Sequence, residues 1–381
     1  MAVATVATVL TAPAVRTIPR TSRLRRRGPR VFPAILLMMV SLATAWAEGP
    51  FDPPRGDARI VVFGDFNGPY GALDYASGVA SVVRSVRDVW RPDLFLSPGD
   101  VIAGQSRSLP DDAFAAMWSA FDATVTAPLR EAGIPHAFAM GNHDASSLRA
   151  PTGGFEFARE RAAAERYWRQ ATLPLQQAYL DRSRFPFDYA FVQAFDGGDL
   201  FVAVIDASSA TVDEGQRSWL QAVLEHPAAV AARYRIVVGH LPLAPVAVGR
   251  DRSGEYLADA ETLRSVMEAG GVDLVVSGHH AAYYFGRLGD LEMLFAGGVG
   301  GRKLLGHDAP ARSTVSVLDL WFATGALQVT TFDLVDMQVV PLETLPPSIG
   351  MVVRRDQAPL RAQGTAASNE APRRPQALQV P

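Results

Sequence analysis

The chain has 381 residues, of which 48% are hydrophobic, so it can bury a substantial core in one large domain or two ordinary ones. It contains no cysteine, which excludes disulfides, thiolate metal sites and cysteine nucleophiles. The first 47 residues carry seven arginines and no acidic residue, so without them the formal net charge falls from −3 to −10. Because nucleic acids need a wide basic surface, we expect no nucleic-acid partner.

Residues 1–47 are predicted to be a signal peptide. Their arginine-rich beginning is followed by an apolar stretch, Val31–Ala47, which is shorter than the roughly 20 residues that span a membrane. Ala45 and Ala47 are small residues suited to cleavage before Glu48. We therefore expect an exported protein, periplasmic or secreted, which is attached to a membrane only if the leader stays uncleaved as an anchor.

Between residues 59 and 140 the pattern alternates between apolar, strand-like runs and helical periodicity. Strands are predicted at 59–63, 94–97 and 136–140. The helices between them are indicated by apolar residues at helical spacing: Val79, Val82, Val83, Val86 and Val89 in the first, and Phe114, Met117, Trp118, Phe121 and Val125 in the second. Such alternation indicates a parallel sheet, in which ligands gather beyond the carboxyl ends of the strands.

Later segments predict an inserted helix, a second sheet and a closing hairpin. The inserted helix is 154–170, and the second sheet begins with an antiparallel hairpin, 189–195 and 200–205. Further elements follow in chain order: a helix around 219–224, a strand at 234–238, a helix at 257–267, and strands at 272–276, 291–295, 314–320 and 326–332. The folded domain is predicted to span residues 48–345, and the aperiodic residues 346–381 to form a disordered tail.

Five short polar segments directly follow apolar runs. They are Gly64-Asp65-Phe66-Asn67, Gly99-Asp100, Gly141-Asn142-His143-Asp144, Gly239-His240 and Gly278-His279-His280. Glycine turns at strand ends can deliver carboxylate, amide and imidazole groups to one place, and imidazole suits zinc, iron and similar ions. A lone Gly-Asp or Gly-His pair is more often a turn than a ligand site, so it is the conjunction of the five that indicates a metal site.

In this order the segments resemble the calcineurin-like metallophosphoesterase family, which includes purple acid phosphatases, over roughly residues 59–335. The resemblance implies an α/β fold, a four-layer α/β-β/α sandwich of two mixed sheets flanked by helices. It also implies one or two divalent metal ions (Mn, Fe, Zn or similar) and a small phosphate ester as substrate. Hydrolysis would use a metal-bound hydroxide, because two ions can polarise a phosphoryl group and lower the pKa of a shared water.

The same resemblance assigns roles to residues of this chain. Six residues would ligate metal, the first two around the first ion and the last three around the second: Asp65, Asn67, Asp100, Asn142, His240 and His279. Asp100 would bridge the two ions. His143 would stabilise or protonate the leaving oxygen, and Asp144 would orient the His143 ring.

Two departures from the family pattern fall on the first metal. The family usually has histidine where this chain has Asn67, and Ala281 stands where the second histidine of Gly-His-x-His is expected. Asparagine can still ligate through its oxygen, whereas alanine cannot ligate at all. His280 is the candidate substitute ligand, although neighbouring side chains of an extended segment point to opposite faces, so His279 and His280 are expected to diverge.

Three functions are compatible with these residues. The main expectation is an exported metal-dependent phosphoesterase that acts on a phosphomonoester or phosphodiester. The alternative is a degenerate single-metal member of the family that serves as a binding or regulatory module with little or no hydrolysis. The third is a surface-binding protein whose tail recruits a partner. In each case the glycine-rich segment Gly297–Gly301 is expected to form a flexible wall of the site.

Overall fold

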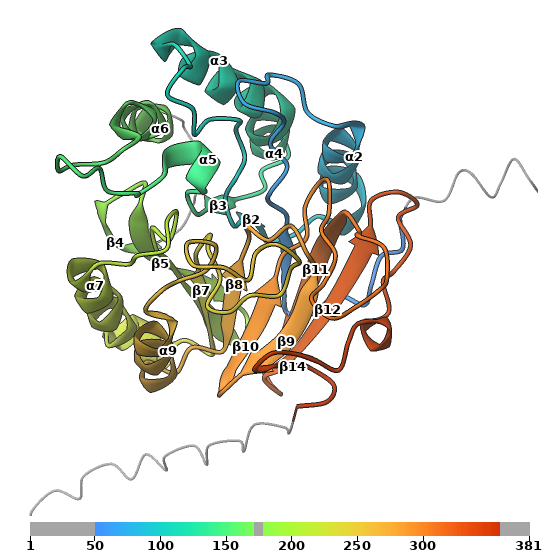
Figure 1. The fold of residues 1–381 in the computed structure, drawn as a ribbon. Helices are drawn as coiled ribbons and strands as arrows, with labels where there is room; N and C mark the ends of the chain where they lie inside the picture. Colours follow the sequence, from blue (N-terminus) through green and yellow to red (C-terminus); the bar gives the residue numbers. More distant parts are fainter. Residues whose placement is uncertain (1–49, 171–177, 359–381) are drawn as a thin grey trace, which may run out of the picture. The chain divides into compact units, whose positions relative to one another are not determined.

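The computed structural model describes residues 50–170 and 178–358. The chain divides into two units, Met1–Glu48 and Gly49–Pro381, and all described residues belong to the second. The predicted leader therefore lies outside the described residues. Two mixed sheets flanked by helices make up the described part, as Figure 1 shows, which confirms the predicted fold class.

The first sheet has five strands, of which three neighbouring ones are parallel. In spatial order the strands are β12 (Ala326–Asp333), β11 (Thr314–Trp321), β1 (Ala58–Val62), β2 (Leu94–Ser97) and β3 (His136–Phe138). β1, β2 and β3 run parallel, whereas β11 and β12 form the predicted closing hairpin, in which β11 pairs antiparallel with β1. Every residue of β1, β2 and β3 is buried, as expected for strands covered on both faces.

The second sheet has nine strands and contains the other parallel group. In spatial order they are β13 (Ser348–Ile349), β14 (Val352–Arg354), β9 (Tyr284–Leu288), β10 (Leu291–Phe295), β8 (Leu274–Ser277), β7 (Tyr234–Val238), β6 (Gly198–Val204), β5 (Asp188–Phe195) and β4 (Ala178–Arg184). β6, β7, β8 and β10 are parallel, and β5 and β6 form the predicted hairpin. The carboxyl ends of β7 and β8 therefore lie at one edge of this sheet.

The helices occupy the predicted positions between strands. They are α2 (Ser77–Ser85), η1 (Val86–Trp90), α3 (Asp111–Phe121), η2 (Asp122–Thr126), α4 (Ala127–Glu131), α5 (Asn142–Ala145), α6 (Ala158–Gln170), α7 (Glu214–Leu224), α8 (Pro227–Ala231), α9 (Ala260–Ala269) and η3 (Leu342–Thr344). α7 begins at a capping box, in which Asp213 accepts from the Gln216 N–H (2.9 Å) and Gln216 accepts from the Asp213 N–H (3.1 Å). None of the described helices is long and apolar enough to span a lipid bilayer.

An aromatic cluster joins α3, α6 and β3. Trp118 stacks on Tyr167 with ring centroids 4.8 Å apart, and Phe138 stacks on Trp168 at 3.4 Å. His136 lies fully buried among these rings, with Nε2 3.0 Å from the Ser97 hydroxyl and with no partner for Nδ1 among the described residues. Burial lowers the pKa of His136 to about 3, so the ring is a neutral core residue.

The predicted start of the tail is wrong. Residues 346–358 are part of the second sheet, because β13 and β14 form a hairpin that pairs with β9. Val352 and Ile349 are buried there, and Arg354 donates from Nη1 to the carbonyls of Glu343 (3.0 Å) and Leu345. Strands of two and three residues are too short to show a period, so composition alone suggested disorder. Residues 359–381 lie outside the described part.

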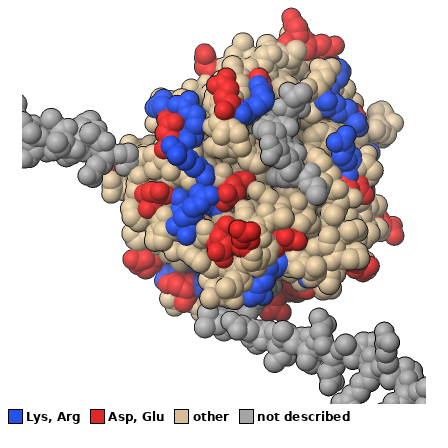
Figure 2. Space-filling model, turned by 180° about the vertical axis from the view of Figure 1, so that it is seen from behind, with Lys and Arg blue, Asp and Glu red and all other residues tan. Residues whose placement is uncertain are grey.

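Basic and acidic side chains are interspersed on the face of the molecule shown in Figure 2. Away from the grey atoms, the blue and red groups alternate and do not gather into one basic field. An extended polyanion binds through a continuous basic surface, so this face is unsuited to that role.

Candidate metal centre

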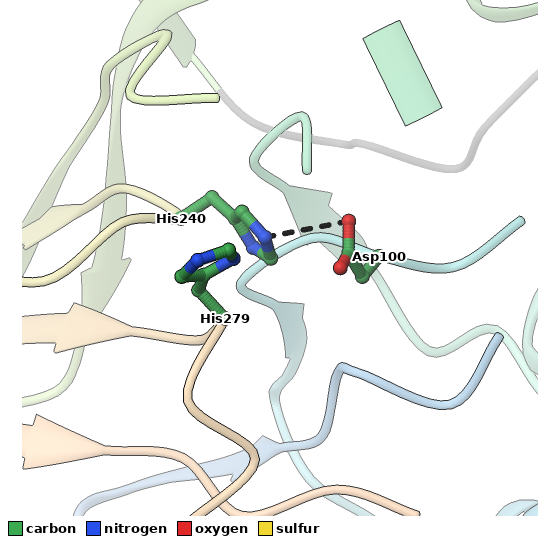
Figure 3. A group of neighbouring side chains, drawn as sticks. All are labelled: Asp100, His240 and His279. Atoms are coloured by element: carbon green, nitrogen blue, oxygen red, sulfur yellow. Dashed lines mark ion pairs between the residues drawn. The ribbon is translucent and has the colours of Figure 1, made fainter. Parts of the chain in front are cut away.

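The five polar segments predicted from the sequence meet at the carboxyl ends of strands from both sheets. Asp65 follows β1, Asp100 follows β2 and Asn142 begins α5 just after β3. His240 and His279 follow β7 and β8 of the second sheet. Figure 3 shows Asp100, His240 and His279 facing one another. One atom of each of these three groups lies within 4.8 Å of the others, so the three side chains can share one cation.

The backbone is left-handed at three of these residues. The φ angles are 50° at Asp65, 53° at Asp100 and 64° at His279, values that residues with a side chain rarely adopt. Each such residue costs on the order of 1–3 kcal/mol, and such strain persists mainly where it orients functional groups. The strained backbone positions therefore coincide with the residues that form the candidate metal centre.

Glycine is required beside Asp100 because the space is closed. A Cβ at Gly141 would lie 2.1 Å from both the backbone nitrogen and Oδ1 of Asp100. The glycine of Gly-Asn-His-Asp thus allows the loop after β3 to pack directly on the carboxylate. The His143 N–H then donates to the same Oδ1 at 2.9 Å.

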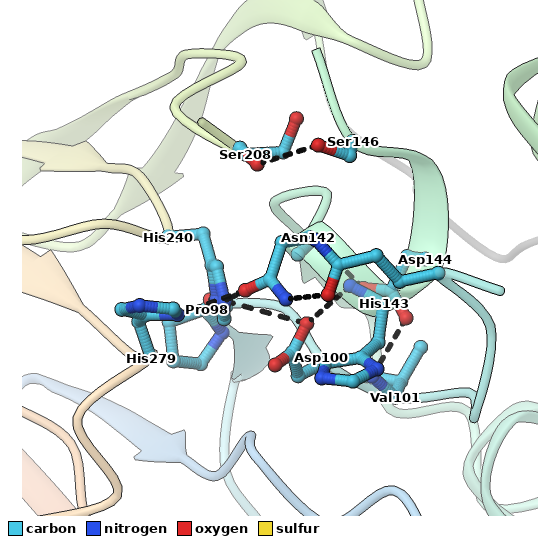
Figure 4. Close-up of polar contacts among 12 residues, drawn as sticks. Pro98, Asp100, Val101, Asn142, His143, Asp144, Ser146, Ser208, His240 and His279 are labelled. Atoms are coloured by element: carbon cyan, nitrogen blue, oxygen red, sulfur yellow. Dashed lines mark hydrogen bonds and ion pairs between the residues drawn. The ribbon is translucent and has the colours of Figure 1, made fainter. Parts of the chain in front are cut away.

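Asn142 lies between the two histidines. Its Oδ1 is 2.9 Å from Nε2 of His240 and 2.8 Å from Nδ1 of His279. Nε2 of His240 is also 3.3 Å from Oδ1 of Asp100. Figure 4 shows this group, and its dashed lines connect Asp100, Asn142 and His240 into one cluster.

The atoms that face one another all become acceptors once His240 gives up its second proton, as the other hydrogen bonds of each group show. His240 donates from Nδ1 to the Pro98 carbonyl (2.8 Å), so Nε2 carries the lone pair of the neutral ring. His279 donates from Nε2 to Oε2 of Glu255 (2.9 Å), which leaves Nδ1 as the acceptor. Asn142 donates from Nδ2 to Oε1 of Gln105 (2.6 Å), so its Oδ1 faces inward. Four converging acceptors fit a divalent cation such as manganese, iron or zinc.

The pKa values of the cluster also indicate that a positive charge stabilises it. Burial lowers the pKa of His240, but the Asp100 carboxylate outweighs it and raises the value to about 9. For His279, burial and the charge of His240 lower the pKa to about 3. The pKa of Asp100 falls below its usual range, because the three nearby imidazoles outweigh the opposing effect of burial. A proton on His240 thus occupies the position of a cation in this cluster.

The model of the calcineurin-like phosphoesterase family matches residues 58–283, which contain every residue of this cluster. The chain belongs to the calcineurin-like phosphoesterase family. No curated protein matches the chain.

Solved structures resemble this chain at low sequence identity. GAP50, the anchor in the inner membrane complex of Plasmodium, has a TM-score of 0.51 at 16% identity, and the match covers 79% of this chain and 90% of GAP50. PhoD (TM-score 0.47, 11% identity, 77% and 73% covered) and a dimetal phosphatase from Danio rerio (TM-score 0.47, 15% identity, 72% and 95% covered) are more distant. At this identity the likeness to GAP50 shows a common fold alone.

The first metal position of the family does not fit the residues of this chain. Oδ2 of Asp65 is buried and has no hydrogen-bond partner among the described residues. The Asn67 N–H donates to the Asp100 carbonyl (3.2 Å), so the loop lies beside Asp100, and the Asn67 oxygen stays a predicted ligand. Ala281 offers no ligand atom. Two carboxylates and one amide without an imidazole are a poor donor set for the zinc or iron expected at such a site.

His280 does not replace the missing histidine, and its prediction as a substitute ligand is wrong. Nδ1 accepts from the Val246 N–H (3.3 Å) and Nε2 donates to the Glu255 carbonyl (3.0 Å), so both ring nitrogens are engaged. The rings of His279 and His280 diverge as expected, but the cause differs. The segment bends through left-handed residues at His279 and Ala281 and is not extended.

Asp144 does not orient the His143 ring, so this prediction is also wrong. Oδ1 of Asp144 accepts from the N–H groups of Val101 (2.8 Å) and Ile102 (2.9 Å), and Oδ2 accepts from the N–H of Gly141 (2.8 Å). Asp144 thereby holds the loops after β2 and β3 together. Burial and the charge of Asp100 raise the pKa of Asp144 to about 6, while the backbone donors oppose that rise.

The carbonyl of Gly104 orients His143 instead. Nδ1 of His143 lies 3.1 Å from that oxygen and donates to it, and the Tyr70 ring lies 5.3 Å away, centroid to centroid. Nε2 of the half-buried His143 is therefore the nitrogen that can exchange a proton. In the neutral ring Nε2 accepts a proton, and the resulting imidazolium can donate that proton as a general acid.

Glu255 is a positioning residue that no motif of the sequence indicated. It accepts from His279 and from Arg250 through Oε2, and from Arg252 through Oε1 at 2.9 Å. Burial raises the pKa of Glu255, but the hydrogen bonds from Arg250, Arg252 and His279 outweigh it and lower the value to about 2. An ionised carboxylate behind a ligand histidine fixes its tautomer and raises its basicity.

Proposed function

We propose that the chain is an exported phosphoesterase that holds one divalent ion through Asp100, Asn142, His240 and His279 and hydrolyses a small phosphate ester. The observation that carries the proposal is the convergence of four acceptor groups, three of which (Asn142, His240 and His279) are oriented by a hydrogen bond on the far side. Membership of the calcineurin-like phosphoesterase family supports the same class of reaction.

The residues of the cluster divide the work between binding and proton transfer. A divalent ion in such a centre polarises a phosphoryl oxygen and lowers the pKa of water. Asp100 and the two imidazoles fix the position of the charge, and Gln105 keeps the Asn142 oxygen turned inward. The backbone N–H of His143 holds the residue next to Asp100, and Nε2 of the protonated His143 ring would donate the proton to the leaving oxygen.

Turnover of an aryl phosphate with added manganese, zinc or iron tests this function. Substitution of His143→Ala should lower kcat by roughly 100-fold or more, the usual contribution of a general acid, while the bound metal stays unchanged. Asp100→Asn should lose metal as well as turnover, because it removes the carboxylate of the cluster.

The alternative function, a single-metal binding module without hydrolysis, has its own outcome. The first metal position motivates this alternative. Ala281 offers no ligand atom and the His280 ring is engaged elsewhere, so only two carboxylates and an amide could bind an ion there. If metal-loaded protein turns over substrate no faster than the His143→Ala variant, the chain is a binding module.

Export is the remaining part of the proposal. The apolar stretch Val31–Ala47 and the small residues before Glu48 support it. Mass spectrometry of protein recovered from the periplasm of a bacterial host should show a chain that begins at Glu48. Recovery of the full-length chain in the membrane fraction would instead indicate an uncleaved anchor.

A further inference from the structure

The loop that follows β2 carries two groups that orient residues of the centre. The carbonyl of Gly104 accepts from Nδ1 of His143 at 3.1 Å. Oε1 of Gln105 accepts from Nδ2 of Asn142 at 2.6 Å. Because one loop contacts both residues, the position of that loop decides how the His143 ring and the Asn142 amide are turned.

Glu160 of α6 holds this loop through both oxygens of its carboxylate. Oε2 accepts from the Gln105 N–H (2.7 Å), and Oε1 accepts from the Ser106 N–H (3.1 Å). The side chain is buried, and two backbone donors compensate a buried carboxylate for the loss of water. α6 also packs against α5, the short helix that contains Asn142 and His143 (Figure 1). One helix thus supports the loop after β2 and the loop after β3.

Close packing at Gly104 joins Glu160 to His143. A Cβ at Gly104 would lie 2.4 Å from the carbonyl oxygen of His143 and 3.0 Å from Oε2 of Glu160, so this glycine lies directly between the two residues. The next residue, Gln105, has a left-handed backbone with a φ angle of 67°. Such a conformation persists only where the surroundings hold it, and Glu160 does so by bonding to the N–H groups of Gln105 and Ser106.

Two buried carboxylates divide the loop at 100–106 between them. Asp144 accepts from the N–H groups of Val101 and Ile102, next to Asp100. Glu160 binds the other end of the loop, from which the Asn142 and His143 side chains are oriented. The two acids therefore have different effects on the centre, although both bind only backbone donors of this loop.

We propose that Glu160 is a positioning residue of the centre, which keeps the Asn142 oxygen turned toward the metal ion and the His143 ring in one tautomer. A carboxylate is needed because both of its oxygens accept, whereas glutamine at this position would present an amide N–H to one of the two backbone N–H groups. The effect on metal affinity needs only the metal site, whereas any effect on turnover rests on the proposed function.

Calorimetric titration of the full chain with manganese tests the effect on Asn142. Glu160→Gln should weaken manganese binding by about tenfold, the scale of one lost hydrogen bond to a charged group. Glu160 acts on Asn142 through Gln105, so adding Glu160→Gln to Gln105→Ala should weaken binding no further. Equal affinities of Glu160→Gln and the wild type, or additive losses in the double variant, would overturn this part of the proposal.

Nitrogen NMR of the histidine rings tests the effect on His143 without turnover. The signals of this ring are those that disappear in His143→Ala. In the wild type they should show a proton on Nδ1, and in Glu160→Gln a mixture of both tautomers. Glu165→Gln is the matched control, because Glu165 lies on the same helix, pairs with Arg169 and has a side chain that is 43% exposed. Unchanged signals in Glu160→Gln, or the same change in both variants, would contradict the role.

These measurements separate failure of this inference from failure of the proposed function. A chain that shows the predicted losses but hydrolyses no ester would keep the positioning role and remove catalysis. A chain whose Glu160→Gln variant turns over esters as fast as the wild type would keep the function and remove the role. Circular dichroism checks that each variant is folded. If Glu160→Gln is not, Glu160→Asp is the second variant, because its shorter side chain cannot reach both N–H groups and should give the same losses.

Discussion

At the scale of single residues, the ligand types were predictable and their orientation was not. The Gly-Asp, Gly-Asn-His-Asp and Gly-His segments place Asp100, Asn142, His240 and His279 in one cluster, as their position after apolar runs predicted. Hydrogen bonds from distant parts of the chain decide which atom faces inward. Glu255 is the main example, because nothing in its local sequence shows that it lies behind His279.

Substitution of Glu255→Gln should weaken manganese binding by about tenfold or more, the usual effect of removing a carboxylate behind a ligand histidine. The neutral amide accepts a weaker hydrogen bond, so the tautomer of His279 is less firmly fixed. Calorimetry measures the affinity for manganese. Glu261→Gln on α9 is the control, because Glu261 also pairs with an arginine, Arg264, but does not contact a histidine of the cluster. Equal affinities of the Glu255 variant and the wild type would contradict the positioning role.

Substitution of Gly141→Ala should abolish most metal binding and lower the free energy of unfolding by about 1–3 kcal/mol, because overpacking forces a shift. The new Cβ would displace Asp100, whose Oδ1 lies 2.1 Å from its position. Gly78→Ala in α2 is the control, because its nearest neighbour would be 3.7 Å away. There we expect a stabilisation of up to about 1 kcal/mol from helix propensity. Urea unfolding and metal titration of both variants provide the comparison.

At the scale of elements, the segments with a clear apolar pattern were predicted and those without one were not. The strands at 59–63, 94–97, 234–238 and 272–276 correspond to β1, β2, β7 and β8. β4 and β9 were not predicted, and β13 and β14 were assigned to a disordered tail. These strands are stabilised by pairing with neighbouring strands, which leaves little trace in local sequence.

The buried histidine of β3 should make the fold sensitive to acid. The folded pKa of His136 is about 3 and the unfolded value is about 6.5, so below pH 6.5 the unfolded chain binds the extra proton and stability falls. Between pH 7 and pH 5 this residue should remove about 2 kcal/mol from the free energy of unfolding. In the His136→Phe variant the free energy of unfolding should fall by about 2 kcal/mol less between these two pH values. Urea unfolding of both proteins at pH 7 and pH 5 measures the difference. An identical pH dependence in the two proteins would show that His136 titrates normally.

At the scale of the whole molecule, the domain is larger than its sequence pattern suggested. The family match ends at residue 283, yet β9 to β14 complete both sheets beyond it. A chain that ends at 345 should lose at least about 3 kcal/mol of unfolding free energy, because two buried aliphatic side chains, Ile349 and Val352, are removed. A chain that ends at 358 keeps β13 and β14 and should unfold like the full-length protein. Thermal melting of the two truncated chains gives the comparison, and equal melting temperatures would mean that β13 and β14 add no stability.

The centre takes its groups from two separate sheets, with Asp100 and Asn142 after strands of one and His240 and His279 after strands of the other. A shared ion would therefore link two parts of the chain that are synthesised one after the other. Neither half alone can assemble the coordination shell. The ion can then bind only after both sheets have folded. A nascent or partly unfolded chain lacks the complete set of ligands and so does not bind metal at this centre.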